Sequence, residues 1–179
     1  SETSTGGLNS TPHIVPTLDL DFANNGSNPF RRPTAIWGDV IVGNPWALYQ
    51  TTGDKRMLEE QYVGAQAWID SGIPRNETGL WDRSTFQYAD WLDPLSPPDA
   101  PGNATTHKHL VADSYLIQMT RLLSQMSRAL GKTQEAVKYT SDRKDLISAF
   151  HDTWIEPYDG LIANVTQTAL TLGIRFDIF

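Results

Sequence analysis

The sequence contains no cysteine, so it offers no disulfide framework, no thiolate nucleophile and no cysteine-ligated zinc site. Positive charge is also scarce, because 14 Lys and Arg stand against 21 Asp and Glu and leave a net charge of -7. That balance provides no basic surface for nucleic acid or anionic lipid. No apolar run approaches the roughly 18 residues that span a bilayer. We therefore expect neither a nucleic-acid partner nor a membrane partner.

Motifs for acyl transfer, phosphate binding and metal binding are missing as well. There is no Gly-x-Ser-x-Gly elbow and no glycine-rich phosphate loop. His107 and His109 lie two residues apart, which on a helix points them to different sides, so we interpret them as helix-start or surface residues rather than joint metal ligands. His13 and His151 have no visible partners. We expect no metal and no cofactor.

Asparagine, by contrast, lies in an unusual number of Asn-x-Ser/Thr sequons. Five of the eight Asn residues do so, without proline in the middle: Asn9, Asn25, Asn76, Asn103 and Asn164. Chance would give only about one or two such matches. The excess favours a glycosylated protein that is secreted, with its signal peptide upstream of this sequence. The alternative is that Thr-rich loops containing Asn form sequons that carry no glycan.

Helical patterns begin after a segment of residues 1–35 that is rich in small and polar residues and has no hydrophobic period. The first expected helix runs from Asp39 to Thr52. Gly53 and Asp54 follow it. Since glycine favours the position after a helix and aspartate the position before one, they predict a tight joint to a second helix, which stops near residues 72–74.

A long polar loop follows, from Gly72 to about Thr106. It contains five prolines and four aromatic residues, Trp81, Phe86, Tyr88 and Trp91. Loops of this length inside compact domains are functional or disordered, and the aromatics argue against disorder.

Three more helices are expected beyond the loop. One spans about His107 to Leu130 and carries its apolar residues on one stripe. Thr133 caps the next, which closes at residues 157–160, and a fifth opens near Asn164. Helix hairpins joined by short glycine-containing turns indicate either a solenoid or a closed toroid. The lack of a fixed repeat and the single long connection favour the toroid, and strand signals are weak everywhere.

A dense motif stands where the first helix begins. It consists of Trp37, Gly38, Asp39, Val40, Ile41, Val42, Gly43, Asn44, Pro45, Trp46, Ala47, Leu48 and Tyr49, followed by Gly53 and Asp54. This stretch resembles the catalytic domain of glycoside hydrolase family 78, the α-L-rhamnosidases, of fungal type. The likeness continues through residues 90–92, the helix from His107, and residues 164–170, and so covers nearly all of the chain from Pro33.

The resemblance implies an all-α fold, namely an incomplete (α/α)6 toroid of antiparallel helix hairpins with long loops. Residues 1–35 would form a loop or extended entry segment, and residues 36–179 would form part of the catalytic domain. Such toroids bind a terminal L-rhamnose in a central funnel and hydrolyse it with inversion. The family's acid glutamate lies in an Asp-Glu-Arg-x-Gly-Trp type motif before the Trp-Gly-Asp segment, and its base glutamate lies after the helices found here. This sequence has neither. We expect an internal fragment that is inactive alone.

The resemblance places Trp37 and Trp91 around the sugar. Asp39 matches the acid of the motif, and it either touches the sugar or caps the helix. Trp81 and Asp90 are further substrate-binding candidates in the aromatic loop, where Gly and Asp neighbours would leave the face of Trp81 open. Tryptophan suits this role because its ring packs on the apolar face of a pyranose. The other tryptophans, at helical spacing, are core candidates: Trp46, Trp68 and Trp154.

An inverting glycosidase needs an acid and a base about 6.5 to 9.5 Å apart. If the sequence were complete, the candidates would be four carboxylates near aromatic residues: Asp39, Asp82, Asp90 and Asp93. The alternative is that these are ordinary surface carboxylates.

Two other functions stay open. The chain could be a non-catalytic carbohydrate-binding or antigenic glycoprotein fragment, or part of a six-hairpin glycosidase for another sugar. An open arc of hairpins exposes apolar surface at its ends, so we expect self-association or pairing with the remaining segments of the parent enzyme.

Overall fold

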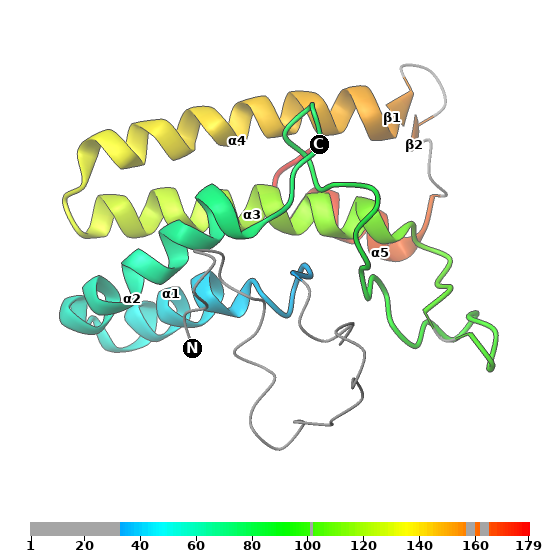
Figure 1. Cartoon of the computed structure of the whole chain (residues 1–179), viewed down its shortest axis with the longest axis horizontal. Coiled ribbons are helices and arrows are strands. Elements are labelled where there is room, and N and C mark those ends of the chain that lie inside the picture. The colour runs from blue at the N-terminus through cyan, green and yellow to red at the C-terminus, as the bar shows by residue number, and fades with distance from the viewer. Residues whose placement is uncertain (1–32, 101, 157–159, 162–164) are drawn as a thin grey trace, which may run out of the picture.

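The structure is a computed structural model, and it describes residues 33–100, 102–156, 160–161 and 165–179 (Figure 1). Its helices are α1 (Val40–Thr52), α2 (Lys55–Ala67), the π-helical turn η3 (Trp68–Gly72), α3 (Lys108–Ala129), α4 (Thr133–Trp154) and α5 (Gln167–Arg175). Two short strands, β1 (Ile155–Glu156) and β2 (Gly160–Leu161), pair antiparallel with Ile155 opposite Leu161. The predicted all-α class is confirmed.

The joint between α1 and α2 forms as the sequence predicts. Gly53 adopts a left-handed conformation with φ 70°, and its N–H donates to the carbonyl of Tyr49 at 2.8 Å. The carboxylate of Asp54 then caps α2 by accepting from the N–H of Met57 at 3.0 Å. These two residues reverse the chain and place α1 against α2.

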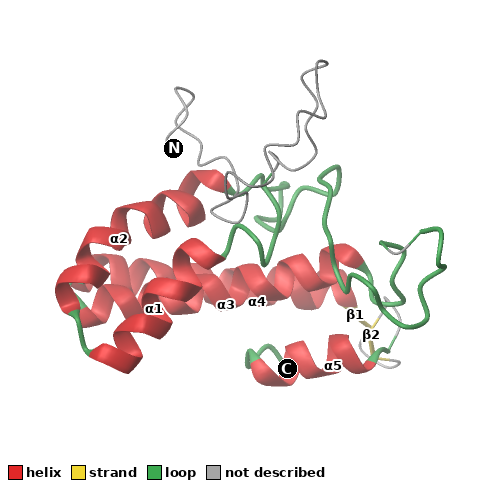
Figure 2. Ribbon diagram, turned by 90° about the horizontal axis from the view of Figure 1, so that it is seen from below, coloured by secondary structure: helices red, strands yellow, loops and turns green. Residues whose placement is uncertain are grey.

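Helix α3 is the centre of the described part of the molecule, because it packs against α1, α2, α4 and α5. Figure 2 shows the α1–α2 hairpin toward one end of α3 and α5 toward the other. The sequence predicted one apolar stripe along this helix, but α3 is buried on most of its sides. Hydroxyls on its buried faces, such as that of Thr120, donate to carbonyls four residues earlier, so these polar groups are paired in the interior.

Three details differ from the sequence prediction. Thr133 is the first residue of α4 rather than its cap, and the preceding Lys132 makes no side-chain capping bond. Helix α5 begins at Gln167, with the hydroxyl of Thr166 accepting from the N–H of Ala169 at 3.1 Å, while Asn164 lies outside the described residues. The short β1–β2 hairpin was not predicted, because two-residue strands carry no periodic signal.

Residues 73–100 and 102–107 belong to the long predicted connection, which contacts α3 (Figure 1). An isolated antiparallel bridge joins Arg75 to Trp81 near its start. Within the described residues, no helix combines the length and apolarity needed to cross a bilayer. Of the predicted lead-in segment 1–35, only residues 33–35 are described.

Candidate functional site

An aromatic patch forms where the turn before α1 meets the long loop. We define it as Trp37, Phe86, Tyr88 and Trp91. The ring of Tyr88 lies at its centre, with centroid distances of 5.7 Å to Trp37, 5.0 Å to Phe86 and 5.5 Å to Trp91, all edge-on. Trp37 is 41% exposed and Trp91 45% exposed. Two indoles far apart in sequence thus share one partner and keep part of their surfaces in solvent.

A buried glutamine brings the two halves of the patch together. The side-chain oxygen of Gln87 accepts from the N–H of Ala35 at 2.8 Å, which ties the loop to the turn that carries Trp37. Successive side chains of an extended chain point to opposite sides. Because Gln87 points inward, Phe86 and Tyr88 on either side of it project toward the patch. Neither was a predicted site residue, and the alternation of aromatic and polar residues at 86–88 is the signal that could have found them.

The backbone is strained beside each exposed ring. Ile36, Ala89 and Leu92 adopt positive φ angles of 70°, 55° and 66°. Left-handed geometry costs an L-residue roughly 1–2 kcal/mol, and for a β-branched residue such as Ile36 it is a genuine outlier. These residues adjoin Trp37, Tyr88 and Trp91 in the chain. Strain of this kind gathers where surrounding contacts hold a functional geometry in place.

Asp39 follows Trp37 by two residues and is only 3% exposed. One carboxylate oxygen accepts from the N–H of Ile36 at 2.6 Å, and the other accepts from the indole N–H of Trp68 at 2.9 Å. Burial raises the pKa of Asp39 from 3.8 to about 6, although both hydrogen bonds act in the opposite direction. Its side chain makes no capping bond to α1. The carboxylate therefore fastens the turn that precedes the helix.

The other two predicted site residues occupy different surroundings. Asp90, half-buried, accepts from the hydroxyl of Thr168 at 2.6 Å and so connects the loop to α5 beside Trp91. Trp81 is fully buried, edge-on to Trp68 at 6.3 Å. The prediction of an open face for Trp81 is wrong, because the bridge to Arg75 turns its ring into the core.

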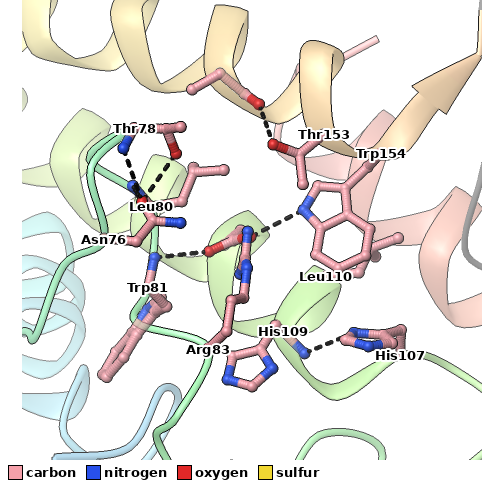
Figure 3. Close-up of polar contacts among 12 residues, drawn as sticks. Asn76, Thr78, Leu80, Trp81, Arg83, His107, His109, Leu110, Thr153 and Trp154 are labelled. Atoms are coloured by element: carbon pink, nitrogen blue, oxygen red, sulfur yellow. Dashed lines mark hydrogen bonds and ion pairs between the residues drawn. The ribbon is translucent and has the colours of Figure 1, made fainter.

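A buried carboxylate braces the loop, and Figure 3 shows the three residues that donate to it, Trp81, Arg83 and Trp154. Asp113 of α3 is 0% exposed and accepts from the backbone N–H of Trp81 at 2.9 Å, from the guanidinium of Arg83 at 2.7 Å and from the indole N–H of Trp154 at 2.8 Å. Burial raises the pKa of Asp113, and the charge of Arg83 opposes this. Loop, α3 and α4 are thereby joined at one point.

The two neighbouring histidines have separate roles. His107 is the N-cap of α3 and accepts from the N–H of His109 at 3.2 Å, as expected of a helix-start residue. His109 is 2% exposed, with a ring nitrogen 3.4 Å from the hydroxyl of Thr85, so the surface alternative is wrong for it. Burial lowers the pKa of His109 to about 4, which leaves it neutral at pH 7. Among the described residues, no group of three or more His, Cys, Asp or Glu could hold a metal ion.

Asp82 and Asp93, two candidate catalytic carboxylates, hold turns of the long loop. Asp82 accepts from the N–H of Ser84 at 2.8 Å, and Asp93 accepts from the N–H groups of Leu95 and Thr105 at 2.9 and 2.8 Å. Hydrogen bonds lower the pKa of each carboxyl, chiefly the one from the Ser84 N–H for Asp82 and the one from the Thr105 hydroxyl for Asp93. A lowered pKa is the reverse of what a general acid needs.

The sequons that can be placed are those of Asn76 and Asn103. The side-chain oxygen of Asn76 accepts from both the N–H and the hydroxyl of Thr78 and from the N–H of Leu80 (Figure 3). Asn103 is exposed. The remaining predicted sites lie outside the described residues: Asn9, Asn25 and Asn164.

Comparison with known proteins decides the family. Residues 2–179 match the family described as the bacterial alpha-L-rhamnosidase 6 hairpin glycosidase domain. This chain belongs to that family. The predicted six-hairpin class is thus confirmed, and the aromatic patch lies within a six-hairpin domain.

Solved and curated relatives agree. The solved α-L-rhamnosidase of Aspergillus terreus is 50% identical, with a TM-score of 0.84, over 95% of this chain and 19% of that chain. The Streptomyces avermitilis α-L-rhamnosidase, solved in complex with L-rhamnose, is 28% identical with a TM-score of 0.67, over 81% of this chain and 13% of that one. A curated α-L-rhamnosidase of Formosa agariphila is 28% identical over 99% of this chain and 18% of its own length. The chain therefore spans less than a fifth of each of these relatives.

Proposed function

We propose that this chain forms one wall of the L-rhamnose subsite in a secreted α-L-rhamnosidase of fungal type. The observation that carries the proposal is the pair of indoles, Trp37 and Trp91, which meet at Tyr88 and remain 41% and 45% exposed. The S. avermitilis relative binds L-rhamnose, and the 50% identity to the A. terreus enzyme supports the fungal type.

The chemistry of the sugar fits this wall. L-Rhamnose is a 6-deoxy pyranose, so it offers an apolar ring face and a methyl group. Indole rings bury such C–H surface and exclude water, while nearby polar groups set the orientation of the hydroxyls. Asp90, beside Trp91 and held by Thr168, is the polar group that we assign to this task.

Hydrolysis itself needs an acid and a base, with a water placed on the far side of the anomeric carbon if the configuration inverts. Asp39 is buried, so its carboxyl does not suit the acid role. The turn carboxylates Asp82 and Asp93 do not suit it either, because their pKa values are lowered. We propose that glutamates from other parts of a longer enzyme supply both groups. The small share of each relative that this chain covers supports this division.

A ligand-observed NMR titration tests the subsite. We expect saturation transfer from the chain to the ring protons and the C6 methyl of L-rhamnose, and its loss in Trp37→Ala and Trp91→Ala. Leu95→Ala is the matched control, because Leu95 is 77% exposed in the same loop and outside the patch. L-Mannose, which carries a hydroxyl at C6, and D-glucose test sugar specificity. Equal transfer in all variants would contradict the subsite, and stronger transfer to D-glucose would favour a glycosidase for another sugar.

A chimera with a related enzyme tests the role of this chain in catalysis. This chain replaces the corresponding segment of the A. terreus enzyme, which it matches at 50% identity, and release of rhamnose from an aryl rhamnoside is measured. We expect activity in the chimera and at least a tenfold loss of kcat/KM with Trp91→Ala, roughly the loss of one well-packed contact. A folded chimera without activity would favour a non-catalytic carbohydrate-binding glycoprotein.

Secretion and glycosylation belong to the same proposal. The sequons at Asn76 and Asn103 lie in the long loop, where Asn103 is exposed and Asn76 is partly exposed. Mass spectrometry of the protein secreted by its native cell, before and after enzymatic removal of N-glycans, should show a mass difference on peptides that contain these residues. Unmodified peptides at both positions would contradict this part.

A further inference from the structure

We propose that Asp39 is a positioning residue, which fixes the orientation of Trp37 through the backbone of the turn 34–39 and does not itself touch the sugar. The inference rests on the proposed rhamnose subsite. It assigns to the carboxylate of the Trp-Gly-Asp segment a role in shaping the wall of that subsite.

Both carboxylate oxygens of Asp39 are already engaged. One receives the N–H of Ile36 and the other the indole N–H of Trp68, at 2.6 and 2.9 Å. At 3% exposure, the side chain has no surface to offer a ligand of pyranose size. A direct contact with sugar would require breaking one of these bonds and opening the turn.

The bond to Ile36 explains how a strained turn persists. Ile36 holds φ at 70°, a conformation that a β-branched residue avoids, and its N–H points into the turn. Two backbone bonds complete the turn, from the N–H of Trp37 to the carbonyl of Ala35 at 2.8 Å and from the N–H of Gly38 to that of Thr34 at 3.0 Å. With Ile36 fixed, the next side chain, Trp37, has one direction in which to leave the backbone. That direction takes it to the edge of Tyr88.

Trp68 holds the Asp39 side chain in the interior through its indole N–H. Its indole is 1% exposed and packs between two glycines. A Cβ atom at Gly38 would lie 2.3 Å from the indole of Trp68, and one at Gly72 would lie 2.8 Å from it, so only glycine fits at either position. Trp68 begins the π-helical turn η3, where one extra residue in the turn rotates the side chains that follow. The path from η3 through Trp68, Asp39 and Ile36 to Trp37 is therefore continuous.

The test uses the full chain labelled with 5-fluorotryptophan. The fluorine resonance of Trp37 is assigned by its disappearance in Trp37→Phe. Asp39→Asn removes one of the two acceptors, and Trp68→Phe removes the indole donor together with part of the buried ring. We expect both variants to shift or broaden the Trp37 resonance, to leave that of Trp154 unchanged, and to raise the Kd for L-rhamnose about tenfold. Asp39→Glu, which keeps both acceptors, should restore part of the affinity.

Leu58→Ala is the matched control. Leu58 is fully buried in α2 and makes no hydrogen bond to the turn, so its loss lowers stability without touching the path described above. Circular dichroism confirms that each variant is folded. An unchanged Trp37 resonance in both Asp39→Asn and Trp68→Phe would overturn the positioning role, as would an equal response in Leu58→Ala.

The two proposals fail in different ways. If the resonance moves and Trp37→Ala still binds L-rhamnose normally, the rhamnose subsite is wrong and the positioning role loses its function with it. If Trp37→Ala abolishes binding while Asp39→Asn keeps full affinity, the subsite stands and the positioning role is overturned.

Discussion

Burial of the Asp39 carboxyl makes the stability of the folded chain depend on pH. Its pKa is about 6 in the folded chain and 3.8 in the unfolded one, so the folded state holds the proton more tightly. The stabilisation is complete below pH 3.8 and is lost as the pH rises through about 6. We predict that the unfolding free energy of the wild type, relative to Asp39→Asn, falls by up to about 3 kcal/mol between pH 4 and pH 7. Urea denaturation at several pH values measures it.

His109 titrates in the same range and in the opposite sense. Its pKa is lowered to about 4, so its contribution is present above pH 6.5 and is lost as the pH falls through 4. Because both proteins contain His109, its effect cancels in the difference between them. A difference that stays constant from pH 4 to pH 7 would show that Asp39 is not buried as described.

Burial of single residues was also where the sequence was least informative. Polar neighbours around Trp81 predicted an open ring, yet its backbone bond to Asp113 and the bridge to Arg75 take it inside. Asp113 is 32 residues away in sequence, so no local pattern around Trp81 could show it. Tyr88 was missed for the same reason, because its place depends on the bond between Gln87 and Ala35.

At the scale of elements, two glycines of α1 make opposite predictions. Gly43 lies inside the helix with no atom within 4 Å of an added Cβ, whereas Gly53 ends the helix at φ 70°. Gly43→Ala should stabilise the chain by about 0.5–1 kcal/mol, because alanine favours the helix. Gly53→Ala should destabilise it by about 1 kcal/mol, because alanine resists positive φ. Thermal unfolding of both variants gives the comparison, and effects of equal sign would contradict the assigned end of α1.

Helices whose signals are local were predicted well. The Gly53–Asp54 joint confirms this, since a glycine after one helix and an aspartate before the next act over a few residues. The single stripe expected for α3 was too narrow, because burial around α3 comes from neighbours at both ends of the chain. Element positions thus follow from local chemistry, and the degree of burial follows from tertiary packing.

At the scale of the whole molecule, apolar surface remains uncovered on α5. Leu170 and Ile174 lie four residues apart on the same face and are 40% and 74% exposed. We predict that the isolated chain self-associates through such surface. Ile174→Lys should lower the apparent mass in light scattering, while Thr171→Lys, which adds the same charge at an exposed polar position of α5, should not. A stable monomer with low binding of a hydrophobic dye would contradict the prediction.

The most direct measurement is a crystal structure of the enzyme that carries this chain, soaked with L-rhamnose. We predict density for the sugar against the exposed surfaces of Trp37 and Trp91, with its methyl group toward an indole and with Asp39 still bound to Ile36 and Trp68. Rhamnose bound elsewhere, with both indoles free of it, would contradict the central claim.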